Sequence, residues 1–399
     1  MRRLNKTSII WVFYVSLNTL SIAFLHAQPD PPMVRQELIF PLQQQHTHGS
    51  SIVELPDGDL LAAWFQGSGE RTADDVRIMG ARLKKGASNW SPVFEMADTP
   101  DIPDCNPVLF LNRENKLFLI WIAVQANRWE NSILRVRTTE NYLQGNAPIW
   151  EWQDNILLKP GDSFAEEVAA KLDQLPDHET GWAAYAPPYD EQIKEASKNP
   201  TYRSLGWMTR IPPLTLANGR ILLPLYSDGL NLSLVAISDD QGQTWYPSEP
   251  IVGRGPIQPS LIETKDGQIV AYMRDSGDAP NRVQISHSSD QGKTWMPAMK
   301  SEIPNTASVA LLKLSDGRWV FVGNVLEDGR YQLMLWVSND EGQSWSKKYL
   351  LENHAKGEGG YSYPCMIQTS DKNLHITYSY HLTGKEKSIK HIEIKSSDF

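Results

Sequence analysis

Cysteine is nearly absent from this sequence, since only Cys105 and Cys365 occur among 399 residues. Two cysteines cannot build a disulfide framework, which excludes the small domains that disulfides hold together. Positive charge is also scarce: 38 Lys and Arg stand against 47 Asp and Glu, and the formal net charge is −9. An acidic surface argues against nucleic acid and anionic membrane as partners. An acidic ligand would therefore need a local cluster of Arg.

One apolar run stands at the N-terminus, from Ile9 to Phe24, and three basic residues precede it. The run is too short and wrongly flanked for a stable membrane span, and Leu25-His26-Ala27 suits a cleavage site. Residues 1–27 are therefore predicted to be a secretory signal, with a retained anchor as the alternative. Cleavage would change the net charge from −9 to −12. The mature protein is expected in the periplasm or outside the cell, with no membrane contact.

A motif of eight residues occurs three times at a spacing of fifty, at 238–245, 288–295 and 338–345, with the pattern S-x-D-x-G-x-[T/S]-W. Its Asp and Ser side chains can bond backbone amides, Gly supplies a positive φ, and Trp covers the turn. A calcium loop gathers about six or more oxygen ligands, whereas each motif offers one or two carboxylates. We therefore interpret the motif as structural, one per repeated unit.

Six hairpins follow the same period, because alternating apolar strands are broken by tight turns. The turns lie at Pro56-Asp57-Gly58, Glu114-Asn115, Asn218-Gly219, Asp266-Gly267, Asp316-Gly317 and Asp371-Lys372-Asn373. Six units of about fifty residues predict an all-β fold, a six-bladed β-propeller over residues 28–399. Residues 162–200 remain as an insertion between blades two and three, with helical spacing at its start. The strand at 37–40 is expected to pair with 388–394 and close the ring, and Cys105 and Cys365 would lie two blades apart.

A propeller starts each innermost strand at one mouth of its central channel, eight or nine positions before each hairpin turn. The six residues found there are His48, Asn106, Arg210, Gln258, Ser308 and Tyr363. None is aliphatic, although aliphatic residues follow each of them. Polar groups converging on one rim are what a binding site needs, although a solvated channel mouth also tolerates them.

The repeated motifs, the triplet Arg210-Ile211-Pro212 and the stretch Gly360-Tyr361-Ser362 resemble the sialidases (neuraminidases) over essentially the whole mature chain. In that family three Arg bind the carboxylate of the sugar, an Asp is the acid/base, and a Tyr paired with a Glu is the nucleophile. A neutral phenol avoids the repulsion that a carboxylate nucleophile would meet at this anionic substrate. Arg suits the substrate carboxylate because its planar fork donates two parallel bonds.

The resemblance places these roles on particular positions. Tyr363 would be the nucleophile, with Tyr361 as the alternative, and Asp75 the acid/base, with Asp74 as its rival and a turn cap as the structural alternative. The carboxylate would be held by a set of arginines, with Asn106 beside them on the rim: Arg210, Arg274 and Arg330. A surface ion pair is the alternative role for Arg274 and Arg330.

The sequence departs from the family at two positions. His48 stands where sialidases carry one Arg, and Gln258 stands at the position of the Glu that activates Tyr. An amide cannot accept the phenolic proton in the way a carboxylate does. Because ring closure sets blade six beside blade one, we hypothesise that His48 acts as the base or positions a water.

The resemblance therefore implies an exported exo-glycosidase that removes a terminal acidic sugar, a sialic acid or related ulosonic acid, from a glycan. Two alternatives stay open: a lyase or hydrolase acting at a uronic acid, and a carbohydrate-binding propeller without turnover. No metal or organic cofactor is indicated, since His375, His381 and His391 lack ligand spacing. The oligomeric state is not predicted.

Overall fold

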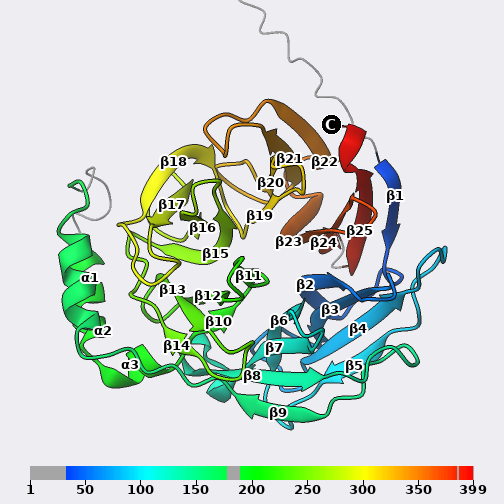
Figure 1. Ribbon diagram of the computed structural model, residues 1–399, viewed down its shortest axis with the longest axis horizontal. Coiled ribbons are helices and arrows are strands. Elements are labelled where there is room, and N and C mark those ends of the chain that lie inside the picture. Colours follow the sequence, from blue (N-terminus) through cyan, green and yellow to red (C-terminus); the bar gives the residue numbers. More distant parts are fainter. Residues whose placement is uncertain (1–32, 178–188, 384–385, 399) are drawn as a thin grey trace, which may run out of the picture.

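Six antiparallel sheets stand around a central axis in the computed structural model, which describes residues 33–177, 189–383 and 386–398. Figure 1 shows the sheets as the blades of a ring. The predicted six-bladed propeller is therefore confirmed. The predicted signal at residues 1–27 lies outside the described residues. Within the described ranges, no helix is long and apolar enough to cross a membrane.

Each blade starts with its innermost strand. Blade one comprises β2 (His46–Glu54), β3 (Leu60–Gly67), β4 (Arg77–Leu83) and β5 (Phe94–Ala97), and blade two comprises β6 (Asp104–Leu111), β7 (Leu117–Val124), β8 (Ser132–Thr139) and β9 (Trp152–Asn155). Blade three comprises β10 (Met208–Thr209), β11 (Leu214–Thr215), β12 (Ile221–Ser227), β13 (Leu232–Ser238) and β14 (Tyr246–Pro247). Blade four comprises β15 (Pro256–Glu263), β16 (Ile269–Asp275), β17 (Arg282–Ser288) and β18 (Met299–Pro304), and blade five comprises β19 (Ala310–Lys313), β20 (Trp319–Gly323), β21 (Gln332–Ser338) and β22 (Lys347–Asn353). Blade six comprises β23 (Gly359–Gln368), β24 (Asn373–Leu382), β25 (Lys387–Lys395) and the N-terminal strand β1 (Met33–Leu38).

Strand β1 closes the ring by pairing with β25 at the opposite end of the chain. Glu37 faces His391 and Leu38 faces Lys390 in an antiparallel register. Figure 1 shows the two strands side by side, blue against dark red. The predicted closure is confirmed, although β1 begins at Met33 and ends at Leu38, earlier than expected. Large side chains such as Trp64, Trp121 and Trp319 are fully buried in the sheets' packing.

The described residues of the insertion between blades two and three include helices, as expected. The insertion contains α1 (Phe164–Leu172), α2 (Tyr189–Ser197) and α3 (Pro200–Ser204), which lie at the outer edge of the ring in Figure 1. Ion pairs attach the insertion to the propeller: Lys171 Nζ lies 2.9 Å from Glu249, and Arg254 Nη2 lies 2.8 Å from Asp190.

The repeated motif forms the turn after the third strand of blades three, four and five. In the first copy Asp240 accepts hydrogen bonds from the amides of Gln243 and Thr244, at 3.1 and 2.9 Å. Gly242 has φ +91°, and a Cβ there would lie 2.7 Å from Phe118 of the preceding blade. The motif thus fixes the turn and lets it pack against the neighbouring sheet, which is a structural role.

Candidate active site

All six rim positions are buried at the start of an innermost strand or just beside it. Their exposed fractions are 5% for His48, 4% for Asn106, 1% for Arg210 and Gln258, 0% for Ser308 and 9% for Tyr363. Buried polar groups need hydrogen-bond partners. The contacts among these six residues therefore decide which donors and acceptors the mouth of the channel offers to a ligand.

A repeated β-bulge turns three of these side chains. Asn106, Gln258 and Tyr363 have φ of 51°, 57° and 58°, and the pairing register shifts at each of them. Each residue precedes a proline. A positive φ at a residue other than glycine costs roughly 1–3 kcal/mol and persists where the surroundings enforce it. Strain repeated at one rim points to a functional site, because bulges re-aim side chains next to such sites.

Tyr363 is the centre of the cluster. Its hydroxyl accepts hydrogen bonds from Gln258 Nε2 at 3.0 Å and from Arg274 Nη1 at 3.4 Å. The Cζ atom of Arg330 lies 5.5 Å from the centroid of the Tyr363 ring. The structure therefore brings two of the predicted arginines to the predicted tyrosine, from blades four and five.

Arg210 lies against the ring of the same tyrosine, with its Cζ 4.7 Å from the centroid. Its Nη1 and Nη2 donate to the carbonyls of Ser50 and Pro364, at 3.2 and 3.0 Å. Burial lowers the pKa of Arg210. Because these donors are occupied and 1% of the residue is exposed, Arg210 ties blades one and six together beneath Tyr363.

His48 also supports Tyr363. The two ring centroids are 4.1 Å apart and the planes are inclined by 34°. Burial, followed by the charges of its neighbours, lowers the pKa of His48 well below its usual value, so the ring is neutral at neutral pH. No hydrogen bond joins this imidazole to the Tyr363 hydroxyl among the described residues, so the observed contact is packing.

A second tyrosine, which the sequence did not single out, connects two rim positions. The Tyr226 hydroxyl accepts hydrogen bonds from Asn106 Nδ2 at 3.1 Å and from Gln258 Nε2 at 3.3 Å. Burial raises the pKa of Tyr226 well above its usual value. The neutral phenol therefore holds Gln258 in place beside Tyr363.

Glu70 and Asp228 bring carboxyl groups close to Arg330 and Arg274, and the sequence analysis missed both. Burial raises the pKa of Glu70 against the opposing effect of Arg71 and Arg330. Water reaches the Asp228 side chain, but protein encloses it closely enough that desolvation raises its pKa too. Both residues follow a second strand, β3 or β12. Such loops lie at the mouth where the innermost strands start, and that topological rule could have found them.

Asp75, the predicted acid/base, is exposed. Its carboxylate accepts hydrogen bonds from the Ser68 amide at 3.0 Å and from Ser68 Oγ at 2.8 Å, and the amide bond lowers the pKa of Asp75. Asp74 is also exposed and accepts a bond from Asn127 Nδ2 at 3.1 Å. The structure describes no contact of either carboxylate with the Tyr363 cluster, and the bonds of Asp75 are those of a turn cap.

Comparison with known proteins agrees with this architecture. The model of the BNR repeat-like domain matches residues 58–202 and 198–376, which together are most of the chain. The chain belongs to the sialidase-like BNR-repeat family. No curated protein matches it.

Solved structures resemble this sialidase-like protein in fold at low sequence identity. The K499G mutant of NanB sialidase from Streptococcus pneumoniae has a TM-score of 0.65 and 12% identity, covering 92% of this chain and 71% of that one. The intramolecular trans-sialidase from Ruminococcus gnavus has a TM-score of 0.61 and 13% identity, covering 88% and 95%. A Dyadobacter fermentans protein of unknown function has a TM-score of 0.67 and 16% identity, covering 92% and 99%.

Tyr361 lies apart from the cluster in this sialidase-like protein. It is fully buried, its hydroxyl is hydrogen-bonded to His354 Nδ1, and its ring centroid lies 5.1 Å from that of Tyr380. Alternation along a strand would put residues 361 and 363 on one face, but the bulge at Tyr363 separates them.

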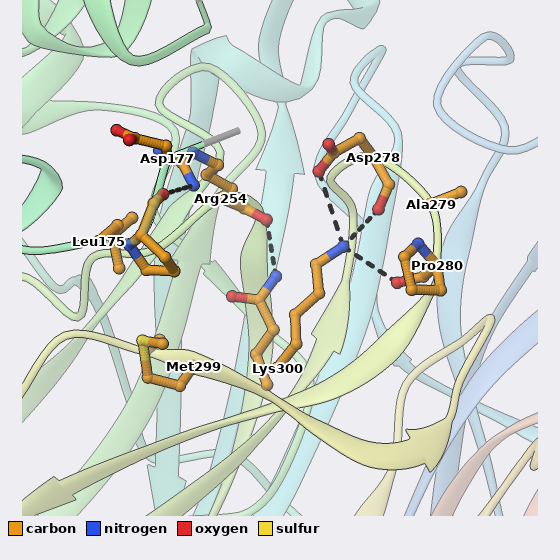
Figure 2. Close-up of a pocket in the computed structure, with 11 residues that line it drawn as sticks. Leu175, Asp177, Arg254, Asp278, Ala279, Pro280, Met299 and Lys300 are labelled. Carbon is orange, nitrogen blue, oxygen red and sulfur yellow. Dashed lines mark hydrogen bonds and ion pairs between the residues drawn. The ribbon is translucent and has the colours of Figure 1, made fainter. Parts of the chain in front are cut away.

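A cavity of roughly 310 Å³ lies elsewhere, between the insertion and blade four, and Figure 2 shows its lining. Its cations are paired: Arg254 Nη1 donates to the Pro176 carbonyl at 2.7 Å, and Lys300 Nζ lies 3.0 Å from Asp275 and 3.6 Å from Asp278. With those groups engaged, we interpret this cavity as a seam that packs the insertion. No group of three or more His, Cys, Asp or Glu in the described parts of the chain is arranged to hold a metal.

Proposed function

We propose that this protein is an exported exo-glycosidase of the sialidase type, which hydrolyses a terminal acidic sugar, a sialic acid or related ulosonic acid, from a glycan. One observation carries the proposal: Arg274 and Arg330 converge on Tyr363 at the mouth of the channel. Two guanidinium groups beside a phenol suit a substrate that carries a carboxylate on its reacting carbon.

The roles follow from position and charge. Arg274 and Arg330 hold the carboxylate of the sugar, and Tyr363 faces the anomeric carbon. We assign protonation of the leaving oxygen to Glu70, because burial raises the pKa of this carboxyl and a raised pKa increases the fraction that carries a proton. His48 and Arg210 pack against Tyr363 and keep its ring in place.

The test is incubation with a panel of sialylated and other acid-capped oligosaccharides, followed by mass spectrometry of the products. We expect release of one acidic monosaccharide, and loss of that release in Arg274→Met and Arg330→Met. Arg113→Met is the matched control, because Arg113 contacts blade three through the Leu216 carbonyl, near the hairpin turn and away from the mouth. A panel in which no acidic sugar is released contradicts the proposal.

A carbohydrate-binding propeller without turnover is the second candidate. It is favoured by Gln258, since no carboxylate hydrogen-bonds the Tyr363 hydroxyl among the described residues and a phenol without a base is a weak nucleophile. Binding on a glycan array, weakened by Arg274→Met and unaccompanied by any product, would support it.

A further inference from the structure

The Tyr363 hydroxyl is surrounded by hydrogen-bond donors. Gln258 approaches it through Nε2 at 3.0 Å and Arg274 through Nη1 at 3.4 Å. Neither group can accept a proton, because an amide nitrogen and a guanidinium only donate. No group in the described part of the chain accepts the phenolic proton, so its loss to solvent breaks no hydrogen bond within the protein and leaves the phenolate with two donated bonds.

In this orientation Gln258 Nε2 lies within hydrogen-bond distance of two tyrosine hydroxyls, while Gln258 Oε1 is buried and has no partner among the described residues. The same Nε2 lies 3.3 Å from the Tyr226 hydroxyl, and Tyr226 is held in turn by Asn106 Nδ2 at 3.1 Å. Gln258 is 1% exposed, so its position is set by these buried contacts and not by solvent. A phenolic oxygen that receives two donated bonds is well suited to carry negative charge.

These contacts favour proton transfer with the substrate over covalent attack. The Glu that pairs with the nucleophilic Tyr of sialidases takes the phenolic proton during attack, and here Gln258 donates at that position instead. A phenol that loses and regains its proton beside fixed donors is a general acid–base catalyst. Arg274 and Arg330 add the second requirement, positive charge where the carboxylate of the substrate develops enolate character.

We propose that this mouth catalyses β-elimination at a uronic acid within a glycan, with Tyr363 as the proton carrier. The inference rests on the same acidic-sugar site as the proposed function. A uronic acid fits because its carboxylate is attached to C5, the carbon that bears the proton to be removed. Binding of that carboxylate by Arg274 and Arg330 makes the C5 proton more acidic.

The step balances without a co-reactant. The Tyr363 phenolate takes the C5 proton, and the C5–H electron pair forms a double bond between C4 and C5. The bond between C4 and the glycosidic oxygen breaks, and the oxygen leaves with the electron pair. That oxygen takes the proton from Tyr363, which returns the phenolate to its starting state. No water is consumed, in contrast to hydrolysis.

The experiment uses oligogalacturonates and glucuronate-containing oligosaccharides as probes, beside a sialylated oligosaccharide, in ¹⁸O-labelled water. We expect the uronate probes to give a product that absorbs in the ultraviolet and contains no ¹⁸O. Tyr363→Phe should lower this rate by about 10²–10⁴-fold, the usual contribution of a general acid–base group. Tyr246→Phe is the matched control, because Tyr246 is exposed and its hydroxyl donates to Asp239 of a repeated motif.

Gln258→Glu tests the donor arrangement directly. A carboxylate there repels the phenolate, so elimination should fall at least tenfold, while the exposed Gln174→Glu, with the same change in charge, should leave it unaltered. Circular dichroism establishes that both variants fold. Elimination unchanged in Gln258→Glu, or uronate products that contain ¹⁸O, would overturn the inference. Release of sialic acid with no unsaturated product would overturn it and leave the proposed function standing, whereas no turnover of any probe would overturn both.

Discussion

Glu70→Gln separates the acid that we propose from the acid that the sequence predicts. The amide keeps the size of the side chain and removes its titratable proton. If Glu70 protonates the leaving oxygen, the hydrolytic rate should fall by about 10²–10⁴-fold at pH 7. The KM should change little, because Arg274 and Arg330, and not Glu70, are the residues proposed to hold the carboxylate of the sugar.

The thermal stability of Glu70→Gln should not fall together with its hydrolytic rate. Burial raises the pKa of Glu70, so its charged form is disfavoured in the folded state. A group of this kind contributes stability below its unfolded pKa and loses that contribution as pH rises through its folded pKa. Glu70→Gln should therefore unfold at a temperature equal to or higher than that of the wild type at pH 7, which a thermal melt measures.

The control is Asp75→Asn, which changes the exposed carboxylate that accepts two bonds from Ser68. Its pKa is lowered, so this charge stabilises the turn above the unfolded pKa and ceases to do so as pH falls. We expect activity within a few-fold of the wild type and a small loss of stability. Strong loss of activity in Asp75→Asn together with an active Glu70→Gln would falsify the assignment of Glu70.

Three further predictions concern the support of the site and the fold. Arg210→Met should lower the free energy of unfolding by about 3 kcal/mol in a urea titration, because two buried carbonyls lose a charged donor; an unchanged midpoint contradicts that role. His48→Ala should lower kcat roughly ten- to a hundredfold by letting Tyr363 move, and His48→Phe should restore most of it; a base at this position would leave both variants equally inactive. The pKa of Asp340 is lowered to about 2 by bonds from Ser344 and Ser338, so its contribution to stability should vanish as pH falls from about 4 to about 2, and Asp340→Asn should flatten that part of the melting curve.

The fold could be predicted because its signals repeat. Three copies of one motif pattern and six hairpin turns set a fixed period, and counting back from each turn reached the rim residues in every blade. The contacts between blades follow from that count, so Tyr363, Gln258 and Arg274 were expected at one mouth although they are far apart in the sequence.

Individual side-chain contacts could not be predicted, because they depend on loops, bulges and hydrogen-bond partners that do not recur at the fifty-residue spacing of the motifs. The register placed Arg210 at the rim correctly but gave no indication that two carbonyls occupy its donors. Glu70 lies in a loop, where no alternation shows whether an acid is enclosed or exposed. The bulge at Tyr363 reverses the face that simple alternation assigns relative to Tyr361.

A single side chain decides which chemistry the mouth supports. The bulges at Asn106, Gln258 and Tyr363 hold the backbone in a strained form whatever the side chain at 258 is, so glutamate would fit in the same place. A glutamate there would withdraw the phenolic proton toward the core, and Tyr363 would face the substrate as a nucleophile. Glutamine donates instead, so it can stabilise the Tyr363 phenolate from which the proposed elimination starts. Under this proposal the same propeller, with the same two arginines, carries out proton transfer at an acidic sugar.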